Sequence, residues 1–340
     1  MSAAGPAPSV AAVAAAADAP LLAVEGLRVA FPTRRGELVA VHDVSFEIRA
    51  GEVLGVVGES GAGKSLTGAA VIGLIDPPGR ITGGEVRLSG RRIDALPDDA
   101  MRKIRGREIG AVFQDPLTAL NPLYTIGRQL TETIAAHLDV DARAARARAL
   151  ALLDEVGIPA PERRFDQYPH QFSGGMRQRV VIALALAANP KLIIADEPTT
   201  ALDVSIQAQI IELLKRLTRE HGTAVMLVTH DMGVIAETAD RVAVMYAGRI
   251  VEIGPVAEVI HSPQHPYTKG LMGAIPALRG ERQRLAQIDG AMPRLDAVPA
   301  GCAFHPRCPH AFDRCRHEIP RRLRSGSTEV ACWLVQADAR

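Results

Sequence analysis

Apolar and polar residues alternate along two segments near the beginning of the chain, 21–31 and 39–48, as they do in strands that bury one face. Three later runs are continuously apolar instead, at 53–57, 192–195 and 224–228. Short runs of that kind are typical of parallel strands that are covered on both faces. The pattern therefore predicts an alternating pair of strands followed by a buried parallel sheet.

Helical periodicity occupies much of the sequence between these runs. We expect helices at 66–74, 126–138 and 142–156. Residues 84–113 suggest further strands around a polar segment, and the pattern becomes helical from about 115 to 175. Strands that alternate with helices indicate an α/β core with a parallel sheet, here interrupted by a helical insert.

Composition divides the chain into three parts. We predict a flexible tail rich in Ala and Pro at 1–19, a core at 20–260 and a separate C-terminal module at 261–340, where Pro, Arg and Cys become frequent. The tail carries no Lys or Arg, which argues against a secretory signal. No apolar run approaches the roughly 20 residues of a membrane-spanning helix. Any association with a membrane is therefore expected to come through partners.

The charge balance bears on the class of partner. Lys and Arg number 39 and Asp and Glu number 38, which leaves a net charge of +1, and aromatic residues make up only 4%. Proteins that bind nucleic acid usually show a basic excess, and those that bind single strands use aromatic stacking. Nucleic acid is therefore not expected as a partner.

The segment Gly58 to Ser65 reads G-E-S-G-A-G-K-S and matches the phosphate-loop pattern G-x-x-x-x-G-K-S/T. It follows an apolar strand and precedes a predicted helix, which is the context that the motif requires. Its backbone N–H groups can surround phosphate oxygens, Lys64 can reach the β- and γ-phosphates, and the Ser65 hydroxyl can bind Mg²⁺. The predicted nucleotide contacts are Gly58, Ser60, Gly61, Ala62, Gly63, Lys64, Ser65 and Leu66.

Two acidic residues, Asp196 and Glu197, end the apolar run at 192–195. A carboxylate in that position can reach the Mg²⁺ of a phosphate-loop site. The next residue along the chain points in another direction. We therefore predict that Asp196 holds the metal and that Glu197 polarises an attacking water.

All four cysteines lie in the last 39 residues, in the spacing Cys302-x5-Cys308-x6-Cys315-x16-Cys332. Clustered cysteines in a cytosolic chain indicate a metal more than disulfides. Four thiolates suit a 4Fe–4S cluster, and neighbouring histidines keep a zinc site open. Spacing alone does not decide between these two, nor does it exclude free or disulfide-bonded cysteines. The histidines are His305, His310 and His317.

Further motifs occur in the order found in one family, so that the chain resembles the ATP-binding subunits of ABC transporters over roughly 21–340. They are Val112-Phe113-Gln114, Phe172-Ser173-Gly174-Gly175, Asp196-Glu197, Ala201-Leu202-Asp203 and His230. Within that family the chain is most similar to the ATPases of oligopeptide and dipeptide importers. The segments that carry this closer likeness are Gln114 to Pro122, Phe172 to Val180 and His265 to Lys269.

The resemblance implies a fold and a set of roles. The fold would be a RecA-like phosphate-loop core with an antiparallel β subdomain, a helical insert and a small C-terminal metal-binding module. Gln114 would contact Mg²⁺ or the attacking water, and His230 would bind the γ-phosphate and hold Glu197 in place. Residues of the Gly-rich turn would bind the γ-phosphate of an ATP held by a second subunit, and Asp203 would lie at the seam between the two. The residues of this turn are Ser173, Gly174 and Gly175.

Some features depart from the commonest family pattern. The Gly-rich turn has Phe172 where Leu is usual and Met176 where Gln is usual, as the peptide-importer branch does. Phe31 would stack on adenine, although its spacing to Lys64 is long and a core position is the alternative. Some members of the branch carry a 4Fe–4S cluster in the cysteine region. The resemblance thus favours a cluster over zinc, with a structural role.

The implied function is that of an ATPase subunit of a bacterial ABC importer for di- or oligopeptides. Its partners would be a second ATPase subunit (a copy or a paralogue), two transmembrane permease subunits and an extracytoplasmic substrate-binding protein. It would then lie on the cytoplasmic face of the inner membrane. The alternatives are another cargo, such as nickel or a glutathione-like peptide, a soluble ATPase acting on ribosomes or DNA, and an ATP-using metal sensor.

Overall fold

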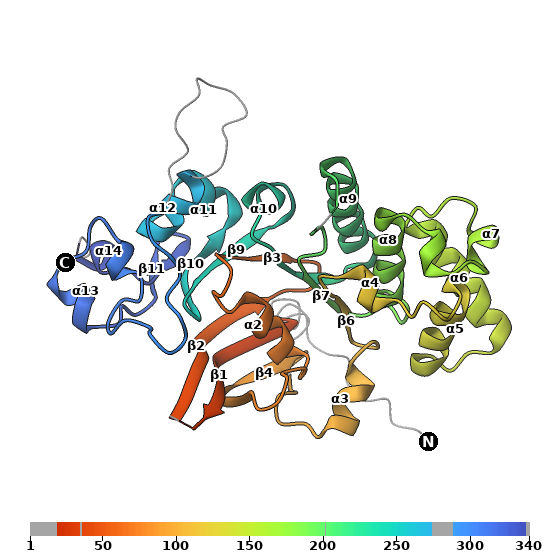
Figure 1. The fold of residues 1–340 in the computed structure, drawn as a ribbon, viewed down its shortest axis with the longest axis horizontal. Coiled ribbons are helices and arrows are strands. Elements are labelled where there is room, and N and C mark those ends of the chain that lie inside the picture. Colours follow the sequence, from red (N-terminus) through yellow and green to blue (C-terminus); the bar gives the residue numbers. More distant parts are fainter. Residues whose placement is uncertain (1–18, 35, 201, 274–287, 338–340) are drawn as a thin grey trace, which may run out of the picture.

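The structure, a computed structural model, describes residues 19–34, 36–200, 202–273 and 288–337. Nearly all of the predicted tail lies outside these ranges. The described chain folds around two sheets, one of four strands and one of eight (Figure 1). None of its helices combines the length and apolarity that a membrane crossing requires.

The smaller sheet is antiparallel and has the order β2-β1-β4-β5. Its first two strands are the alternating segments of the sequence, paired from Leu22 with Ile48 to Thr33 with Gly36. The predicted alternation is confirmed, because residues such as Leu22, Val24 and Val29 are buried on one face. The strands are β1 (Leu22–Thr33), β2 (Gly36–Ile48), β4 (Arg80–Leu88) and β5 (Arg91–Arg92).

The larger sheet has the order β11-β12-β10-β9-β3-β8-β7-β6. From β9 to β6 all neighbours are parallel, whereas β10, β12 and β11 are added in antiparallel fashion. The three continuously apolar runs form β3, β7 and β8, as predicted. The strands are β3 (Val53–Val57), β6 (Ile109–Val112), β7 (Leu192–Asp196), β8 (Ala224–Val228), β9 (Arg241–Tyr246), β10 (Arg249–Pro255), β11 (Leu323–Ser325) and β12 (Thr328–Val330).

The run that forms β3 is apolar throughout because both faces of this strand are buried. Leu54 and Val56 belong to the hydrophobic cluster shared with the small sheet, and Val53 and Val57 belong to the cluster on the opposite face. Successive side chains of a strand point to opposite faces, so that both faces must be apolar where both are covered. The carboxyl end of β3 is thereby fixed in the centre of the molecule, where the phosphate loop begins.

The helical insert forms the lobe at the right of Figure 1. Thr125 and Asp141 cap its two longest predicted helices by accepting bonds from the N–H groups of Arg128 and Ala144. Both helices begin as predicted and end one residue early. The insert contains α4 (Pro116–Ala119), α5 (Ile126–His137), α6 (Ala142–Glu155), α7 (Pro161–Phe165), the short helix η1 (Pro169–Gln171) and α8 (Gly174–Ala185).

Other helices cover the core. The helix expected at 66–74 is α2, which begins two residues earlier because the phosphate loop passes directly into it. The polar segment within 84–113 contains a helix that the sequence did not predict, α3, which buries only Met101 and Ile104. Their bounds are α2 (Lys64–Val71), α3 (Asp98–Ile104), α9 (Val204–His221), α10 (Met232–Thr238) and α11 (Val256–His261).

The C-terminal part, where periodicity fades, continues the large sheet. Strand β12 pairs with β10 through Glu252 and Val330, and Tyr246, Tyr267 and Phe304 pack ring against ring with centroids 4.7–5.4 Å apart. The segment predicted as a separate module thus shares both a sheet and an aromatic cluster with the core, and a domain boundary near 260 stays a prediction. Its helices are α12 (Pro266–Gly273), η2 (His305–Arg307), α13 (Asp313–His317) and α14 (Trp333–Ala337).

Candidate functional site

The phosphate loop lies between β3 and α2, and its shape depends on glycine. Gly58 has φ 151° and Gly63 has φ 98°, both in the region that side chains disfavour. A Cβ atom on Gly58 would also lie 2.3 Å from the carbonyl oxygen of Met245. The loop therefore turns where only glycine fits and leads into the N-terminus of α2, which attracts anions.

Lys64 is held inside this loop. Its side chain is buried, and Nζ donates to the carbonyl oxygens of Gly58 at 2.7 Å and Glu59 at 3.1 Å. Burial lowers the pKa of Lys64, while the carboxylates of Glu197 and Asp196 oppose that shift. The ammonium group is thus positioned at the centre of the loop, within reach of a bound phosphate.

Ser65 and Asp196 meet as a metal site would require. The Ser65 hydroxyl, on α2, donates to Asp196 Oδ1 at 2.9 Å, and Asp196 ends β7. Burial raises the pKa of Asp196, and the neighbouring Glu197 adds to this, whereas the bond from Ser65 and the charge of Lys64 oppose it. A hydroxyl and a carboxylate are hard oxygen ligands of the kind that Mg²⁺ uses beside a nucleotide. The donor set fits the predicted ion.

Glu197 gathers the other predicted catalytic residues. Its Oε2 accepts from Gln114 Nε2 at 3.1 Å and from the Thr200 hydroxyl at 2.8 Å, and its Oε1 lies 3.1 Å from His230 Nδ1. Burial disfavours the charged carboxylate, but these bonds, with the charges of His230 and Lys64, lower the pKa of Glu197 overall. Glu197 is consequently ionised and oriented, as a proton acceptor must be.

Sequence reasoning missed Thr200, because a threonine after a strand end has no distinctive spacing. The strained backbone of Glu197 could not be foreseen either: its φ is 46°, and its N–H donates to the carbonyl of Val228 at 2.8 Å. That conformation turns the Glu197 side chain away from the direction of Asp196. Strain of this kind is tolerated where the surroundings fix it and is frequent at functional sites.

The Gly-rich turn lies elsewhere. The Ser173 hydroxyl accepts from the N–H of Met176 at 3.3 Å and caps α8, and both Ser173 and Gly174 are exposed. A Cβ on Gly175 would lie 2.6 Å from Cγ2 of Ile206, which fixes this position as glycine. In Figure 1, helix α8 and helix α2, which follows the phosphate loop, lie apart.

Two further predicted contacts are Asp203 and Phe31. Asp203 is exposed at the N-cap of α9, close in sequence to the Glu197 segment. Phe31, on β1, is half-buried, and its ring lies so close to Gly79 that a Cβ there would come within 2.5 Å of Cε1. The stacking of adenine on Phe31 and the placement of Asp203 at a dimer seam both stay predictions.

The four cysteines line one small cavity in the C-terminal part, next to Trp333 and Phe304. The space between them is about 10 Å³, room for roughly one water molecule. Burial raises the pKa of Cys302 to about 11, and the pKa values of Cys308 and Cys332 are raised for the same reason. Convergent buried thiols are the donor set that soft metal centres use.

Two metal centres, a single zinc and a 4Fe–4S cluster, can be compared with the positions of these cysteines. Among the described residues, no three cysteine or histidine ligand atoms in this region lie within 4.8 Å of one another. A single tetrahedral zinc, with Zn–S bonds of about 2.3 Å, would hold its sulfurs about 3.8 Å apart. A cluster of four irons and four sulfides spreads its thiolates more widely. The donor types fit either group, and the choice between a cluster and zinc stays a prediction.

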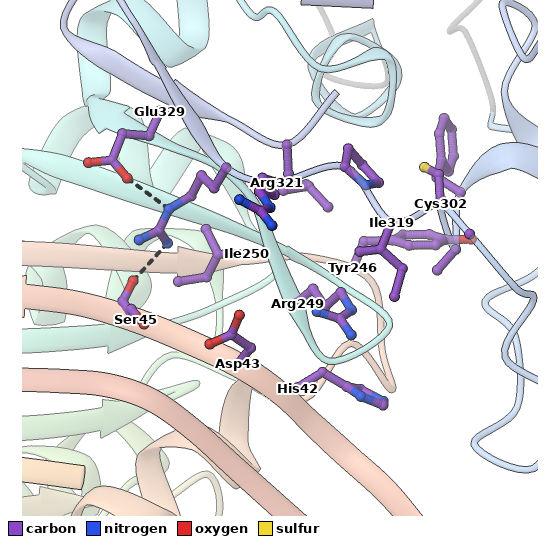
Figure 2. Close-up of a pocket in the computed structure, with 17 residues that line it drawn as sticks. His42, Asp43, Ser45, Tyr246, Arg249, Ile250, Cys302, Ile319, Arg321 and Glu329 are labelled. Atoms are coloured by element: carbon purple, nitrogen blue, oxygen red, sulfur yellow. Dashed lines mark hydrogen bonds and ion pairs between the residues drawn. The ribbon is translucent and has the colours of Figure 1, made fainter. Parts of the chain in front are cut away.

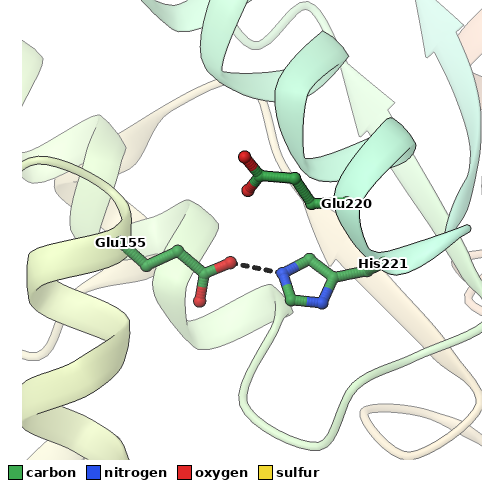
Figure 3. A group of neighbouring side chains, drawn as sticks. All are labelled: Glu155, Glu220 and His221. Atoms are coloured by element: carbon green, nitrogen blue, oxygen red, sulfur yellow. Dashed lines mark hydrogen bonds and ion pairs between the residues drawn. The ribbon is translucent and has the colours of Figure 1, made fainter.

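One group in the described residues does meet that distance criterion: Glu155, Glu220 and His221, at the ends of α6 and α9 (Figure 3). His221 Nε2 is bonded to Glu155, and Arg216 bridges the same two acids, donating to the Glu155 carbonyl and pairing with Glu220 at 3.7 Å. A guanidinium at this point already supplies the positive charge. The group is best interpreted as an ion-pair network that joins two helix ends.

One cavity beside the C-terminal part is separate from the phosphate loop. It has a volume of about 540 Å³ and separates the small sheet from residues 319–322 (Figure 2). Arg322 crosses it, donating to the Ser45 carbonyl at 2.7 Å and pairing with Glu329 at 2.8 Å. No residue of the phosphate loop lines this cavity. The bond from Arg322 to Ser45 joins the C-terminal segment to strand β2.

Comparison with known proteins agrees with this geometry. Residues 41–200 match the family model described as "ABC transporter", and residues 251–315 match "Oligopeptide/dipeptide transporter, C-terminal region". The chain is 49% identical over 316 residues to the dipeptide transport ATP-binding protein DppD of Bacillus subtilis, covering 92% of this chain and 94% of that protein. It is 48% identical over 300 residues to DppD of Escherichia coli, covering 88% and 92%.

Solved structures give the same answer. The dimeric, post-hydrolysis ATP-binding cassette MJ0796, bound to ADP and Pi, superposes with a TM-score of 0.62 at 32% identity, covering 69% of this chain and 98% of that one. CbiO1 of Clostridium perfringens, part of the ABC transporter complex cbiONQ, superposes with a TM-score of 0.62 at 28% identity, covering 72% and 91%. With its phosphate loop, its paired acids and its Gly-rich turn, the chain belongs to the ABC transporter family and is one of its ATP-hydrolysing subunits.

Proposed function

We propose that this ATPase powers the import of di- or oligopeptides. The observation that carries the proposal is the match of residues 251–315 to the C-terminal region of oligopeptide/dipeptide transporters. The B. subtilis relatives named for dipeptide and oligopeptide transport, each 49% identical, support the same cargo class. The nearest alternative is another small cargo, such as nickel or a glutathione-like peptide, on the same ATPase.

The chemistry of the site follows from the contacts described above. Lys64 and the loop N–H groups bind the phosphates of ATP, and Ser65 and Asp196 would hold Mg²⁺, which neutralises charge on the phosphates when bound. Glu197 accepts the proton of the attacking water, and His230 and Gln114 keep its carboxylate oriented. None of these residues requires the cargo to be present, so that cargo selection must lie in other subunits.

We propose that the second half of each ATP site comes from another ATPase subunit, a copy or a paralogue. Ser173 and Gly174 are exposed at the N-terminus of α8, so that this anion-binding helix end is accessible to another subunit. Closure of two subunits would bring this turn onto the partner's γ-phosphate. Asp203, at the start of α9, would lie along the seam.

Two permease subunits would carry this motion to the membrane and hold the ATPase at its cytoplasmic face. A groove of about 400 Å³ beside α4 and α8 is lined largely by apolar residues, and Phe113 at its edge is 48% exposed. Gln114, which bonds Glu197, follows Phe113 directly. A permease segment that docks in this groove would therefore be coupled to the hydrolytic carboxylate.

The test of cargo is reconstitution of the ATPase with its permeases in proteoliposomes, with a peptide-binding protein added outside. We expect ATP hydrolysis to rise several-fold with peptide-loaded binding protein and radiolabelled dipeptide to accumulate. Stimulation by nickel-loaded but not peptide-loaded binding protein would overturn the peptide assignment and leave the ATPase assignment intact. Copurification with ribosomes, and not with permeases, would favour a soluble role.

For the cysteines we propose a structural 4Fe–4S cluster, with zinc as the alternative. The four cysteines line one cavity, and four thiolates are the ligand set of such a cluster. The assay is anaerobic purification followed by iron, sulfide and zinc analysis and visible absorption. Four irons and four sulfides for each chain are expected. Stoichiometric zinc without iron would refute the cluster.

A further inference from the structure

Arg307 joins the cysteine region directly to the phosphate loop. It ends the short helix η2, immediately before Cys308, yet its guanidinium bonds Glu59, 248 residues earlier in the chain. Nη1 lies 2.8 Å from Oε2 and Nη2 lies 3.1 Å from Oε1, so that the pair is bidentate. The Arg307 side chain is only 7% exposed. A buried, two-pronged pair is far more directional than a surface ion pair.

The Arg307 guanidinium is fixed from its own side as well. Nε donates to the carbonyl of Asp289 at 2.8 Å, and Nη2 lies 3.3 Å from the carbonyls of Ile288 and Gly290. The guanidinium therefore cannot swing to another partner without breaking several bonds. Its orientation toward Glu59 is therefore set by the way the C-terminal part packs.

Glu59 is also held through its backbone. Its N–H donates to the Tyr267 hydroxyl at 2.9 Å, and Tyr267 is completely buried. The Glu59 carbonyl accepts from the N–H of Ala62 at 3.1 Å and from Lys64 Nζ at 3.1 Å. Thus the first turn of the phosphate loop is anchored at one end by two residues of the C-terminal part and at the other by the loop itself.

The Glu59 side chain poses an electrostatic problem in this place. A carboxylate in a loop that binds the triphosphate competes with the phosphates for Lys64 and repels them. A guanidinium that takes both carboxylate oxygens removes that competition. It also keeps the side chain turned toward the C-terminal part and away from the phosphate cradle.

We propose that Arg307 and Tyr267 are positioning residues for the ATP site: together they fix Glu59, and Arg307 neutralises it, so that the phosphate loop is preorganised for ATP. Both residues act through Glu59, to which they are bonded. The C-terminal part that carries the cysteines thereby contributes to ATP affinity in its own chain. This inference rests on the nucleotide site and is independent of the cargo.

The test is a double-mutant cycle on full-length protein, with ATP affinity measured by equilibrium titration of a fluorescent ATP analogue. Arg307→Ala is expected to weaken binding about tenfold, because preorganisation is lost and the Glu59 charge is released. In a Glu59→Gln background the same substitution should cost less than about twofold, since no charge remains to neutralise. Equal losses in both backgrounds would overturn the proposal.

Two further variants keep the test decisive if Arg307→Ala folds poorly. Arg307→Lys retains the positive charge but cannot form the bidentate pair, and its ATP affinity should lie between those of wild type and Arg307→Ala. Tyr267→Phe removes only the hydroxyl group and should weaken ATP binding about threefold. The apparent KM for ATP should rise in both, with kcat changed by less than about twofold. Wild-type affinity in both variants would also overturn the proposal.

The matched control is Arg314→Ala. Arg314 lies in the same region, 3.6 Å above the Trp333 ring, and pairs with Glu318 at 2.8 Å. It has no recorded bond to the phosphate loop, so that ATP affinity should stay at the wild-type value. A loss equal to that of Arg307→Ala would attribute the effect to general damage of the cysteine region and refute a specific role for Arg307. Metal content, measured for every variant, reports that damage separately.

Discussion

The two anion-binding turns of this chain differ in how complete they are. The phosphate loop is enclosed by its own chain: Lys64 is buried, and Ser65 is bonded to Asp196. At the second turn, Ser173 is exposed and its hydroxyl accepts the N-cap bond from Met176. Both use a helix N-terminus and glycine, and in the first a buried lysine and the carboxylates of Asp196 and Glu197 complete the site. The difference agrees with the proposal that one chain builds an ATP-binding site and supplies part of a second site to a partner subunit.

The comparison separates binding from turnover. Residues around the phosphate loop should control the affinity of the isolated chain for ATP, whereas the exposed turn should matter only when two subunits meet. The solved relative MJ0796, described as dimeric in its post-hydrolysis state, is consistent with that division. Variants on the two sides can therefore be sorted by whether they change affinity, turnover or both.

The largest effect is expected from Lys64→Ala. The substitution removes the charge at the centre of the loop, and loss of such a contact costs about 2–5 kcal/mol, or on the order of 10³-fold in ATP affinity. Equilibrium binding of a fluorescent ATP analogue measures it. An affinity within a few-fold of wild type would mean that the loop is not the nucleotide site.

Glu197→Gln should come next. The amide cannot accept a proton, so that kcat is expected to fall by about 10²-fold or more while ATP affinity is retained. Because ATP then persists, the closed dimer should accumulate, which light scattering coupled to gel filtration detects. Turnover near the wild-type rate would show that another group activates the water.

Ser173→Ala tests the exposed turn. We expect kcat to fall about tenfold through loss of the hydroxyl, and the unfolding free energy to fall by about 1 kcal/mol through loss of the N-cap of α8. ATP affinity of the isolated chain should not change. If the substitution weakened that affinity as Lys64→Ala does, the two turns would serve the same nucleotide and the comparison would fail.

The smallest effect is expected from Phe31→Leu. If the Phe31 ring stacks on adenine, ATP should bind about threefold to tenfold more weakly, as expected for an aromatic contact worth about 0.5–1.5 kcal/mol. The control is competition by GTP. If an adenine contact is lost, the ratio of the affinity for ATP to that for GTP should decrease. Unchanged affinity with a lowered melting temperature would assign Phe31 to the core, where it packs near Gly79.

Much of the nucleotide site could be predicted because its residues occupy strand ends with invariant chemistry. Asp196 and Glu197 follow the apolar run of β7, which is parallel to β3 and separated from it by β8, so that both carboxyl ends lie at the same edge of the sheet. His230 and Gln114 could be placed only through resemblance, since a single histidine or glutamine after a strand has no decisive spacing. The structure then brings both to the Glu197 carboxylate.

Other features could not be predicted, because they depend on contacts between distant segments or on elements too short to show a pattern. Helix α3 is short and mostly polar, with Met101 and Ile104 as its only buried side chains, so that its periodicity is weak. Strands β11 and β12 have three residues each, too few to alternate recognisably. The Arg307–Glu59 pair joins segments 248 residues apart, and neither side chain is unusual in its own neighbourhood.

The position of Arg307 in the chain has a consequence for synthesis. A ribosome completes the phosphate loop, the paired acids and the Gly-rich turn long before it reaches residue 307. A nascent or prematurely terminated chain would thus carry every ATP-binding motif and still lack the pair that steadies Glu59. If the pair strengthens ATP binding as proposed, truncated chains would compete poorly for nucleotide, and only finished subunits would load efficiently. The last-made segment would then serve as a check on completion.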